Sequence, residues 1–202
     1  MNQDATKEQL ILIAARRRFA HYGFSKVTMD EIAGDVGLAK PSLYYYYPTK
    51  ENLFRAVIAQ EQSRFIRDMD NLITRGIPAS TKLRKYVGVR FRLFRELVNL
   101  NALSFRTWSE VRSMSGDLFK NLEKQELKAI HRILTLGKSS GAFSCVSPHR
   151  TAVLLLHVLH GLRLRVIRGE EGRPVTDEAY AELKKESEHF VDIVLNALRT
   201  HH

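Results

Sequence analysis

The chain has 202 residues, of which 44% are hydrophobic and 27% are charged, and this suits one or two globular domains with a sizeable core. The single cysteine, Cys145, argues against a disulfide framework and fits a reducing cytoplasm, and no apolar run approaches the roughly 20 residues of a membrane span. A formal net charge of +10 favours a polyanionic partner, although the positive excess is densest between residues 51 and 115.

The first predicted helix covers residues 6–22 and follows a polar start that lacks the pattern of a signal peptide. Gly23 stands where such a helix would end in a left-handed residue. Arg16, Arg17 and Arg18 lie inside this helix, and they either form a solvated face or touch DNA. The apolar stripe at helical spacing consists of Leu10, Ile11, Ala14, Ala15 and Phe19.

A second helix is predicted to begin at Thr28, because Thr28 and Glu31 have the spacing of a capping box. In such a box the threonine hydroxyl accepts a hydrogen bond from one backbone N–H, and the glutamate accepts one from another. Ile32 and Ala33 then fall on one helical face. Gly37 is placed to end this helix in a left-handed conformation.

A third short helix is predicted to open at Ala39-Lys40-Pro41 and to stop at Pro48, because proline is tolerated in a first turn. It carries Leu43 and a run of four tyrosines. Two short helices joined by a glycine-containing turn have helix-turn-helix geometry, in which the second helix lies in the DNA major groove. The alternative is a helical hairpin inside a core, but four consecutive tyrosines cannot all face inward on one helix.

These motifs together resemble the TetR family of transcriptional regulators. The resemblance covers about the first 60 residues in motif detail, and the rest only in length and helical layout. Three positions depart from the family pattern, since Ala39 replaces a serine cap, Pro41 stands where glycine is common, and Tyr47 replaces phenylalanine. The lost cap removes about 1 kcal/mol of helix stability. The matching segments run from Phe19 to Phe24, Thr28 to Ala33, Gly37 to Tyr47 and Lys50 to Leu53.

The resemblance implies an all-α protein of about nine helices, with a helix-turn-helix DNA-binding domain at residues 1–50 and a larger ligand-binding and dimerisation domain at residues 51–202. It also implies a homodimer that places two recognition helices in successive major grooves of a near-palindromic operator on double-stranded DNA. Repression is the family's usual mode, and members of the family commonly use the lysine at the position of Lys50 to contact a phosphate. The candidate DNA-binding residues are Thr28, Lys40, Pro41, Ser42, Tyr44, Tyr45, Tyr46 and Lys50.

The chain beyond residue 48 is predicted to be a succession of helices, because no alternating strand pattern of useful length occurs in it. One long helix runs without a break from Thr49 or Lys50 to about Thr74, and it would tie the DNA-binding domain rigidly to the second domain. The further helices are predicted at residues 80–97, 100–112, 115–136 and 148–168 and from residue 176 onward, with a loop at residues 137–147.

The helix at residues 151–167 is apolar on more than one face, which is more than a monomer core usually needs. With the last helix it is similar to the paired helices through which the TetR family dimerises. Gly161 in mid-helix would be justified by the close approach of a partner helix, since glycine there costs about 1 kcal/mol relative to alanine. The alternative is ordinary burial within one chain.

Aromatic and basic residues alternate in the segments that line the effector cavity in TetR-family proteins. The aromatic residues form either plain core or a pocket wall, and the arginines either cover a solvated surface or pair with an anionic effector. Apolar walls with a few cations favour an amphipathic anion, such as a fatty acid or its thioester, with Arg106 as its partner. The candidate ligand-binding residues are Phe91, Phe94, Phe105, Arg106, Trp108 and Phe119.

The leading hypothesis is therefore a ligand-responsive DNA-binding regulator, and the alternatives are an architectural DNA-binding protein and an all-helical enzyme. We expect no catalytic site, because the sequence has no glycine-rich phosphate loop, nucleophile elbow or metal-ligand cluster. His157 and His160 have a spacing that could chelate a metal, but no Cys, Asp or Glu accompanies them in that helix. We expect no metal and no cofactor.

Overall fold

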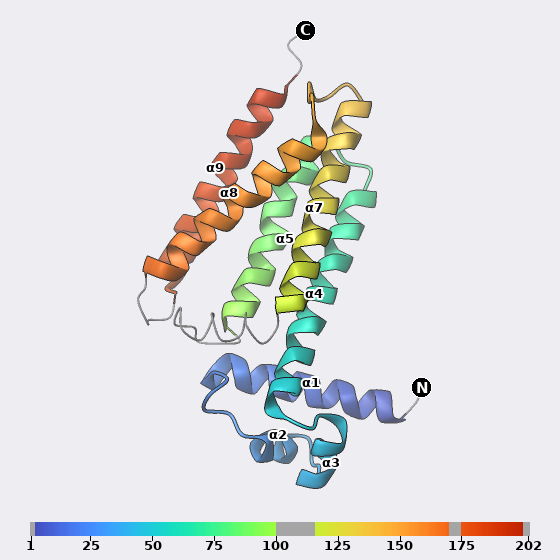
Figure 1. The fold of residues 1–202 in the computed structure, drawn as a ribbon, viewed down its shortest axis with the longest axis vertical. Helices are drawn as coiled ribbons and strands as arrows, with labels where there is room; N and C mark the ends of the chain where they lie inside the picture. Colours follow the sequence, from blue (N-terminus) through green and yellow to red (C-terminus); the bar gives the residue numbers. More distant parts are fainter. Residues whose placement is uncertain (1–2, 100–115, 170–174, 200–202) are drawn as a thin grey trace.

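The computed structural model describes residues 3–99, 116–169 and 175–199, which form eight helices and no strand (Figure 1). The predicted all-α class is confirmed for these ranges, while the helix predicted at 100–112 lies outside them, together with Phe105, Arg106 and Trp108. The helices are α1 (Gln3–Tyr22), α2 (Met29–Asp35), α3 (Lys40–Tyr46), α4 (Lys50–Thr74), α5 (Ala79–Asn99), α7 (Gly116–Ser139), α8 (Pro148–Gly169) and α9 (Asp177–Leu198).

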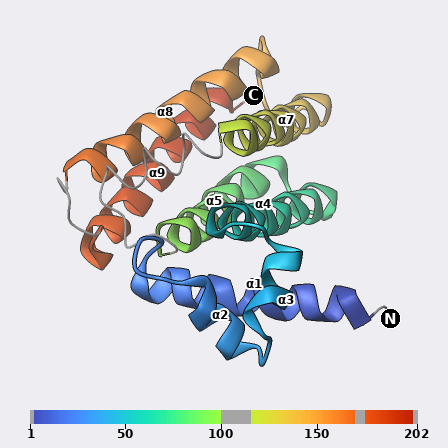
Figure 2. The ribbon, with the colours of Figure 1, turned by 60° about the horizontal axis from the view of Figure 1, so that its bottom comes forward.

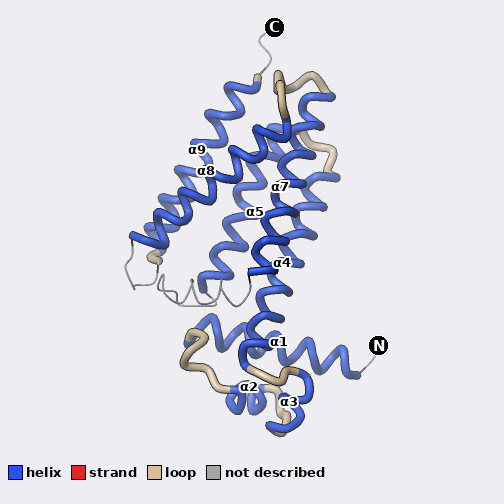
Figure 3. Tube along the Cα trace, viewed as in Figure 1, coloured by secondary structure: helices blue, strands red, loops and turns tan. Residues whose placement is uncertain are grey.

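The helices form a small unit and a larger bundle, which α4 connects. Figure 1 shows α1, α2 and α3 gathered at the foot of the molecule and α4 rising from them into the bundle. There α4 packs against α5 and α7, while α8 and α9 lie side by side on one flank (Figure 2). Figure 3 shows that the described connections between neighbouring helices are short. None of the helices in the described ranges is long and apolar enough to cross a membrane.

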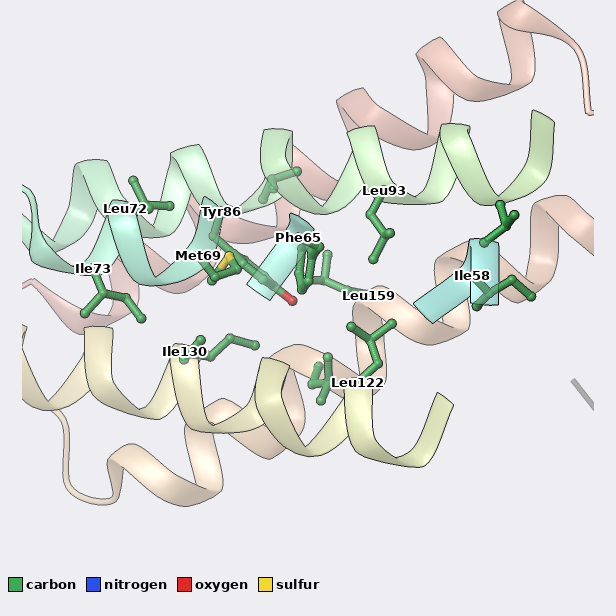
Figure 4. Packing of buried hydrophobic residues seen from close by; sticks show 14 of the residues in the cluster. Ile58, Phe65, Met69, Leu72, Ile73, Tyr86, Leu93, Leu122, Ile130 and Leu159 are labelled. Atoms are coloured by element: carbon green, nitrogen blue, oxygen red, sulfur yellow. The ribbon is translucent and has the colours of Figure 1, made fainter. Parts of the chain in front are cut away.

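The main apolar core continues along α4 through both units. In the small unit the ring of Phe19 meets that of Phe54 edge to face, with 5.1 Å between the ring centroids. In the bundle Phe65 of α4, Ile130 of α7 and Leu159 of α8 are buried in the same core (Figure 4). Each fully buried apolar side chain contributes about 1.5–3 kcal/mol, so the core strongly favours the attachment of the small unit to α4.

Local sequence signals explain most of the helix boundaries. The capping box predicted at Thr28 is present, with both of its reciprocal hydrogen bonds to Glu31. Gly37 follows α2 with a φ of 66°, a left-handed conformation that other residues rarely adopt. α4 begins after the cap residue Thr49 and ends at Thr74, as predicted. Ala39 makes no side-chain capping bond at the start of α3, in agreement with the predicted loss.

The helix α7 continues to Ser139, past the predicted end at residue 136. Gly137 therefore lies inside the helix and does not end it. A Cβ atom added at Gly137 would lie 2.0 Å from the ring of Phe143, which folds back onto the helix. Residue 137 must therefore lack a side chain so that the following loop can pack. The prediction that residues 137–139 belong to the loop was wrong for this reason, and the glycine serves a close approach instead of a turn.

Candidate nucleic-acid interface and ligand site

The helix pair α2 and α3 is held together locally and presents one exposed surface. The Glu31 carboxylate accepts hydrogen bonds from the backbone N–H and the hydroxyl of Thr28, both at 2.8 Å, and these bonds lower the pKa of Glu31. The Thr28 hydroxyl is thus committed to the cap, although the residue is exposed and stays a candidate for a phosphate contact. Lys40 of α3 donates to Asp30 of α2 at 2.9 Å, and Asp30 raises the pKa of Lys40.

The tyrosine run of α3 divides between the surface and the core. Tyr45 is 85% exposed and Tyr44 is 39% exposed, while Tyr46 is half-buried and its ring meets that of Tyr45 edge to face. Tyr47 is buried and donates a hydrogen bond to the Glu8 carboxylate at 3.0 Å, and burial raises its pKa. The expectation that these tyrosines cannot all face inward is confirmed. Lys40, Pro41 and Ser42 are exposed on the same short helix.

Lys50 has a structural role that the sequence did not reveal. Its ammonium group donates to the backbone carbonyls of Phe24 at 2.9 Å, Val27 at 3.0 Å and Ser25 at 3.5 Å, and it lies 4.6 Å from the centroid of the Phe24 ring. These contacts fasten the first turn of α4 to the connection between α1 and α2. A phosphate contact by Lys50 stays a prediction, and it would compete with these carbonyls.

The arginine run of α1 consists largely of structural ion pairs. Arg16 lies 2.9 Å from the buried Glu61 carboxylate of α4. Arg18 forms a two-pronged pair with Asp35 of α2, at 2.6 and 2.7 Å, which lowers the pKa of Asp35. Arg17 is exposed. The two roles predicted for this run, a solvated face or DNA contacts, therefore miss the ion pairs that join α1 to its neighbours.

Three of the predicted ligand-binding residues come together at the lower end of the bundle. Phe94 is buried with Tyr180 and Leu183 in a second apolar cluster, separate from the main core. The rings of Phe94 and Tyr180 are 5.4 Å apart. We call these three residues, together with the partly buried residues packed against them, the aromatic cluster; the partly buried members are Phe91, Phe119, Leu162, Val166 and Val175.

A buried polar cluster of Tyr86, Arg90, Glu126 and His160 crosses from α5 to α7 and α8. The Glu126 carboxylate accepts hydrogen bonds from the Tyr86 hydroxyl at 2.8 Å and from Arg90 Nε at 2.9 Å, and its other oxygen lies 3.4 Å from His160 Nε2. Although burial alone would raise the pKa of Glu126, Arg90 and the hydrogen bonds hold it at about 2. Burial lowers the pKa of His160, so this imidazole is neutral at pH 7.

The polar cluster was not predicted, and it corrects the expectation for one arginine. Arg90 is only 6% exposed, so it belongs to the interior and not to a solvated surface. Its Nη1 also donates to the carbonyl of Leu159 at 3.2 Å. A spacing rule cannot find such a pair, because Arg90 and Glu126 lie on different helices. His157 is exposed while His160 binds Glu126, and no group of three metal-ligating side chains occurs in the described part of the chain.

A cavity of about 120 Å³ lies between α7 and α8, next to both clusters. Its wall includes Glu126 and His160 of the polar cluster and Phe119 of the aromatic cluster. Arg163 of α8 also lines it, and the guanidinium of Arg163 lies 5.4 Å from the centroid of the Phe94 ring. The remaining lining residues are Leu122, Glu123 and Leu164.

The outer surface of α8 and α9 exposes large apolar side chains. Leu154 is 65% exposed, Ile193 is 54% exposed, and Val158 is exposed as well. Gly161 is exposed, and a Cβ atom added there would meet no atom within 4 Å. The other face of α8 is buried through Ala152, Leu155, Leu156 and Leu159. Burial within one chain, the alternative weighed for this helix, therefore accounts for only one of its apolar faces.

Comparison with known proteins supports the resemblance. The family model described as "Bacterial regulatory proteins, tetR family" matches residues 11–57. A crystal structure of a transcriptional regulator from Cytophaga hutchinsonii is 36% identical, with a TM-score of 0.87 over 95% of this chain and 98% of that one. The fatty acid metabolism regulator protein of Bacillus subtilis is 27% identical over 144 residues, which span 70% of this chain and 73% of that protein.

A further structure has the same fold at lower identity. It is the transcriptional regulator FadR of Bacillus subtilis in complex with stearoyl-CoA, which is 21% identical, with a TM-score of 0.66 over 95% of this chain and 99% of that one. At this identity the likeness concerns the arrangement of the helices.

Proposed function

The chain belongs to the TetR family of bacterial transcriptional regulators, and from that premise we propose that it is a repressor which a small-molecule effector releases from its operator. It is a DNA-binding regulator, and we assign it a binding role in place of a catalytic one. A protein that acts on the bacterial chromosome works in the cytoplasm, which is the location that we propose.

The exposed face of α3 is the observation that carries this proposal. A recognition helix must present hydrogen-bonding and apolar side chains to base edges while its other side packs on the domain. α3 meets this requirement, because Ser42, Tyr44 and Tyr45 are exposed while Leu43 is fully buried. We assign Tyr45 to base contacts, since its side chain projects furthest into solvent. Lys40 can exchange Asp30 for a DNA phosphate, because both partners of that pair are exposed.

The surface of α8 and α9 supports a homodimer. Leu154, Val158 and Ile193 are exposed apolar side chains on two adjacent helices, and Gly161 leaves room for a partner backbone. Apolar residues exposed on neighbouring elements mark interaction surfaces. In a dimer formed there, two copies of α3 would face two half-sites of a near-palindromic operator.

The effector that we propose is an amphipathic anion bound in the bundle. The similar Bacillus subtilis protein is named for fatty acid metabolism, and the structure of FadR contains stearoyl-CoA. An effector acts by population shift, so it must bind the conformation that releases DNA more tightly than the conformation that binds it.

DNase I footprinting upstream of the protein's own gene tests the proposed function. We expect wild type to protect a near-palindromic sequence, and Tyr45→Ala to weaken binding to that sequence more than binding to random DNA. Tyr22→Ala is the matched control, because Tyr22 is an exposed tyrosine on α1, outside α3. Equal losses on both DNAs would reject the assignment of Tyr45 to base contacts. Protection without sequence preference would indicate an architectural protein.

A further inference from the structure

The wall of the cavity between α7 and α8 combines Glu126 and His160 of the polar cluster with Phe119 of the aromatic cluster. We propose that this cavity binds the carboxylate or phosphate headgroup of an amphipathic effector, through Arg163, with the apolar part of the effector against the aromatic cluster. This inference rests on the proposed function, because it locates and specifies the effector site. It replaces Arg106, which lies outside the described residues, with a partner whose position is known.

The size of the cavity suits a headgroup. Pockets that enclose a whole drug-sized ligand have volumes of roughly 300–1,000 Å³. The cavity here has a volume of about 120 Å³, so it can hold a carboxylate or one phosphate group but not an acyl chain as well. The rest of such a ligand must lie against a neighbouring surface.

The aromatic cluster provides that surface. Phe119 lines the cavity and belongs to the aromatic cluster, so a ligand that leaves the cavity along Phe119 next meets other partly buried members of that cluster, such as Phe91 and Leu162. Arg163 also connects the cavity to the aromatic cluster, because it lines the cavity while its guanidinium lies over the ring of Phe94. Polar and apolar recognition are thus adjacent, as an amphipathic molecule requires.

Neither carboxylate of the cavity wall is well placed to bind a cationic ligand, and this favours an anionic one. Glu126 is the counter-ion of Arg90, and its oxygens already contact Tyr86, Arg90 and His160. It is therefore not available to a cation. Glu123, the other acidic residue of the wall, is partly exposed, so water screens its charge. His160 is neutral, which leaves Arg163 as the cation of the wall.

The chemistry of the donors agrees with this choice. A guanidinium has five N–H donors in a planar fork, and this shape matches the two oxygens of a carboxylate or phosphate.

Calorimetry with four probes that share one alkyl chain tests the proposal: decanoate, decanoyl-coenzyme A, decanol and decyltrimethylammonium. Wild type should bind at least one of the two anions more tightly than decanol, and the cation least. Arg163→Gln should weaken anion binding by about tenfold or more and leave decanol binding unchanged, because only the charged fork is lost. Arg163→Lys should recover part of the affinity. Arg132→Gln, which removes an exposed arginine of α7, is the matched control and should bind as wild type does.

The two anions separate the possible sources of the headgroup. Tighter binding of decanoate assigns the cavity to a free carboxylate, while tighter binding of the thioester assigns it to a phosphate. Decanol binding by a variant shows that the variant is still folded and that its apolar surface is intact. Unchanged anion binding by Arg163→Gln, a preference for the cation, or no binding of any probe by wild type would overturn the proposal. DNase I footprinting with the same wild-type protein would show separately whether it binds a specific operator, as the proposed function requires.

Discussion

At the scale of single residues, a side chain that the sequence assigns to a DNA contact can also hold the DNA-binding unit together. Lys50 illustrates this, because its three N–H donors face three backbone carbonyls. Those carbonyls belong to the connection between α1 and α2, which has no regular structure of its own to satisfy them. A lysine with this role fixes the angle at which α4 leaves the small unit.

Replacing Lys50 with methionine should destabilise the protein by about 1–3 kcal/mol, because carbonyls bonded to a charged donor lose their partner while the apolar stem is kept. Denaturant unfolding followed by circular dichroism measures the change. Lys26→Met is the control, since Lys26 is exposed on the same connection. If stability were unchanged and binding to all DNA sequences fell with a salt slope lower by about 1, Lys50 would be a phosphate ligand instead.

Glu126 should make stability depend on pH at the acidic end. Its folded pKa of about 2 is below the ordinary value of 4.5, so the folded state binds this proton less tightly than the unfolded state. Its stabilisation is therefore fully present above pH 4.5 and is lost as the pH falls towards 2. Glu126→Gln should cost about 3–5 kcal/mol at pH 7, because Arg90 would stay buried without its counter-ion.

The measurement is the difference in unfolding free energy between wild type and Glu126→Gln at several pH values. That difference should shrink as the pH is lowered from 4.5 towards 2. Glu123→Gln, one turn earlier on α7 and partly exposed, should show a much smaller difference. A difference for Glu126 that does not vary with pH would mean that its carboxyl group is not ionised in the folded protein.

At the scale of elements, α4 is joined to its two neighbours by ion pairs of different strength. Towards α1, Arg16 contacts Glu61, whose side chain is almost fully buried. Towards α7, the partly exposed Arg55 contacts Asp117 at 2.8 Å, and the side chain of Asp117 is 67% exposed. Water and salt therefore screen the second pair more than the first. The small unit should therefore move with the first half of α4, while the contact with α7 can change.

Arg16→Ala should destabilise the protein by about 1–3 kcal/mol, since it removes the closer of two cations from a buried carboxylate and leaves Arg64 at 3.4 Å. Arg55→Ala should cost less than about 1 kcal/mol, because its pair is exposed. Thermal and denaturant unfolding of the two variants provides the comparison, and each serves as the control for the other. Equal costs would show that the exposed pair is as firm as the buried one, and that α4 is held equally on both sides.

The elements were largely predictable from the sequence, because their signals are local. Examples are the capping box at Thr28, the left-handed Gly37 and the start of α4 at Lys50. Each of these signals depends only on residues within a few positions along the chain. The sites were less predictable, because Arg90 and Glu126 are brought together only by the packing of α5 on α7. The exposed tyrosines of α3 could be proposed from periodicity, but the partners of Lys50 and Arg16 could not.

At the scale of the whole molecule, the structure makes a sharp test of dimerisation possible. Gly161→Leu should leave the single chain intact, since Gly161 is exposed and an added Cβ atom meets no atom within 4 Å, but it should block a partner helix. Sedimentation velocity should show more monomer for this variant than for wild type. Gly88→Leu, with equally open space in the middle of α5, is the matched control. Wild type that stays monomeric at micromolar concentration would reject the proposed dimer.

The continuity of α4 has a mechanical consequence. A helix of 25 residues is about 37 Å long at a rise of 1.5 Å per residue, and one end of α4 lies in the bundle while the other carries α1, α2 and α3. A tilt of about 5° at the upper end therefore displaces the lower end by about 3 Å. In a dimer the two displacements add, against a half-site separation of about 34–36 Å set by the pitch of DNA. In the proposed dimer this helix would act as a lever, so that the proposed ligand headgroup, only a few atoms wide, would change the fit to two major grooves without unfolding any element.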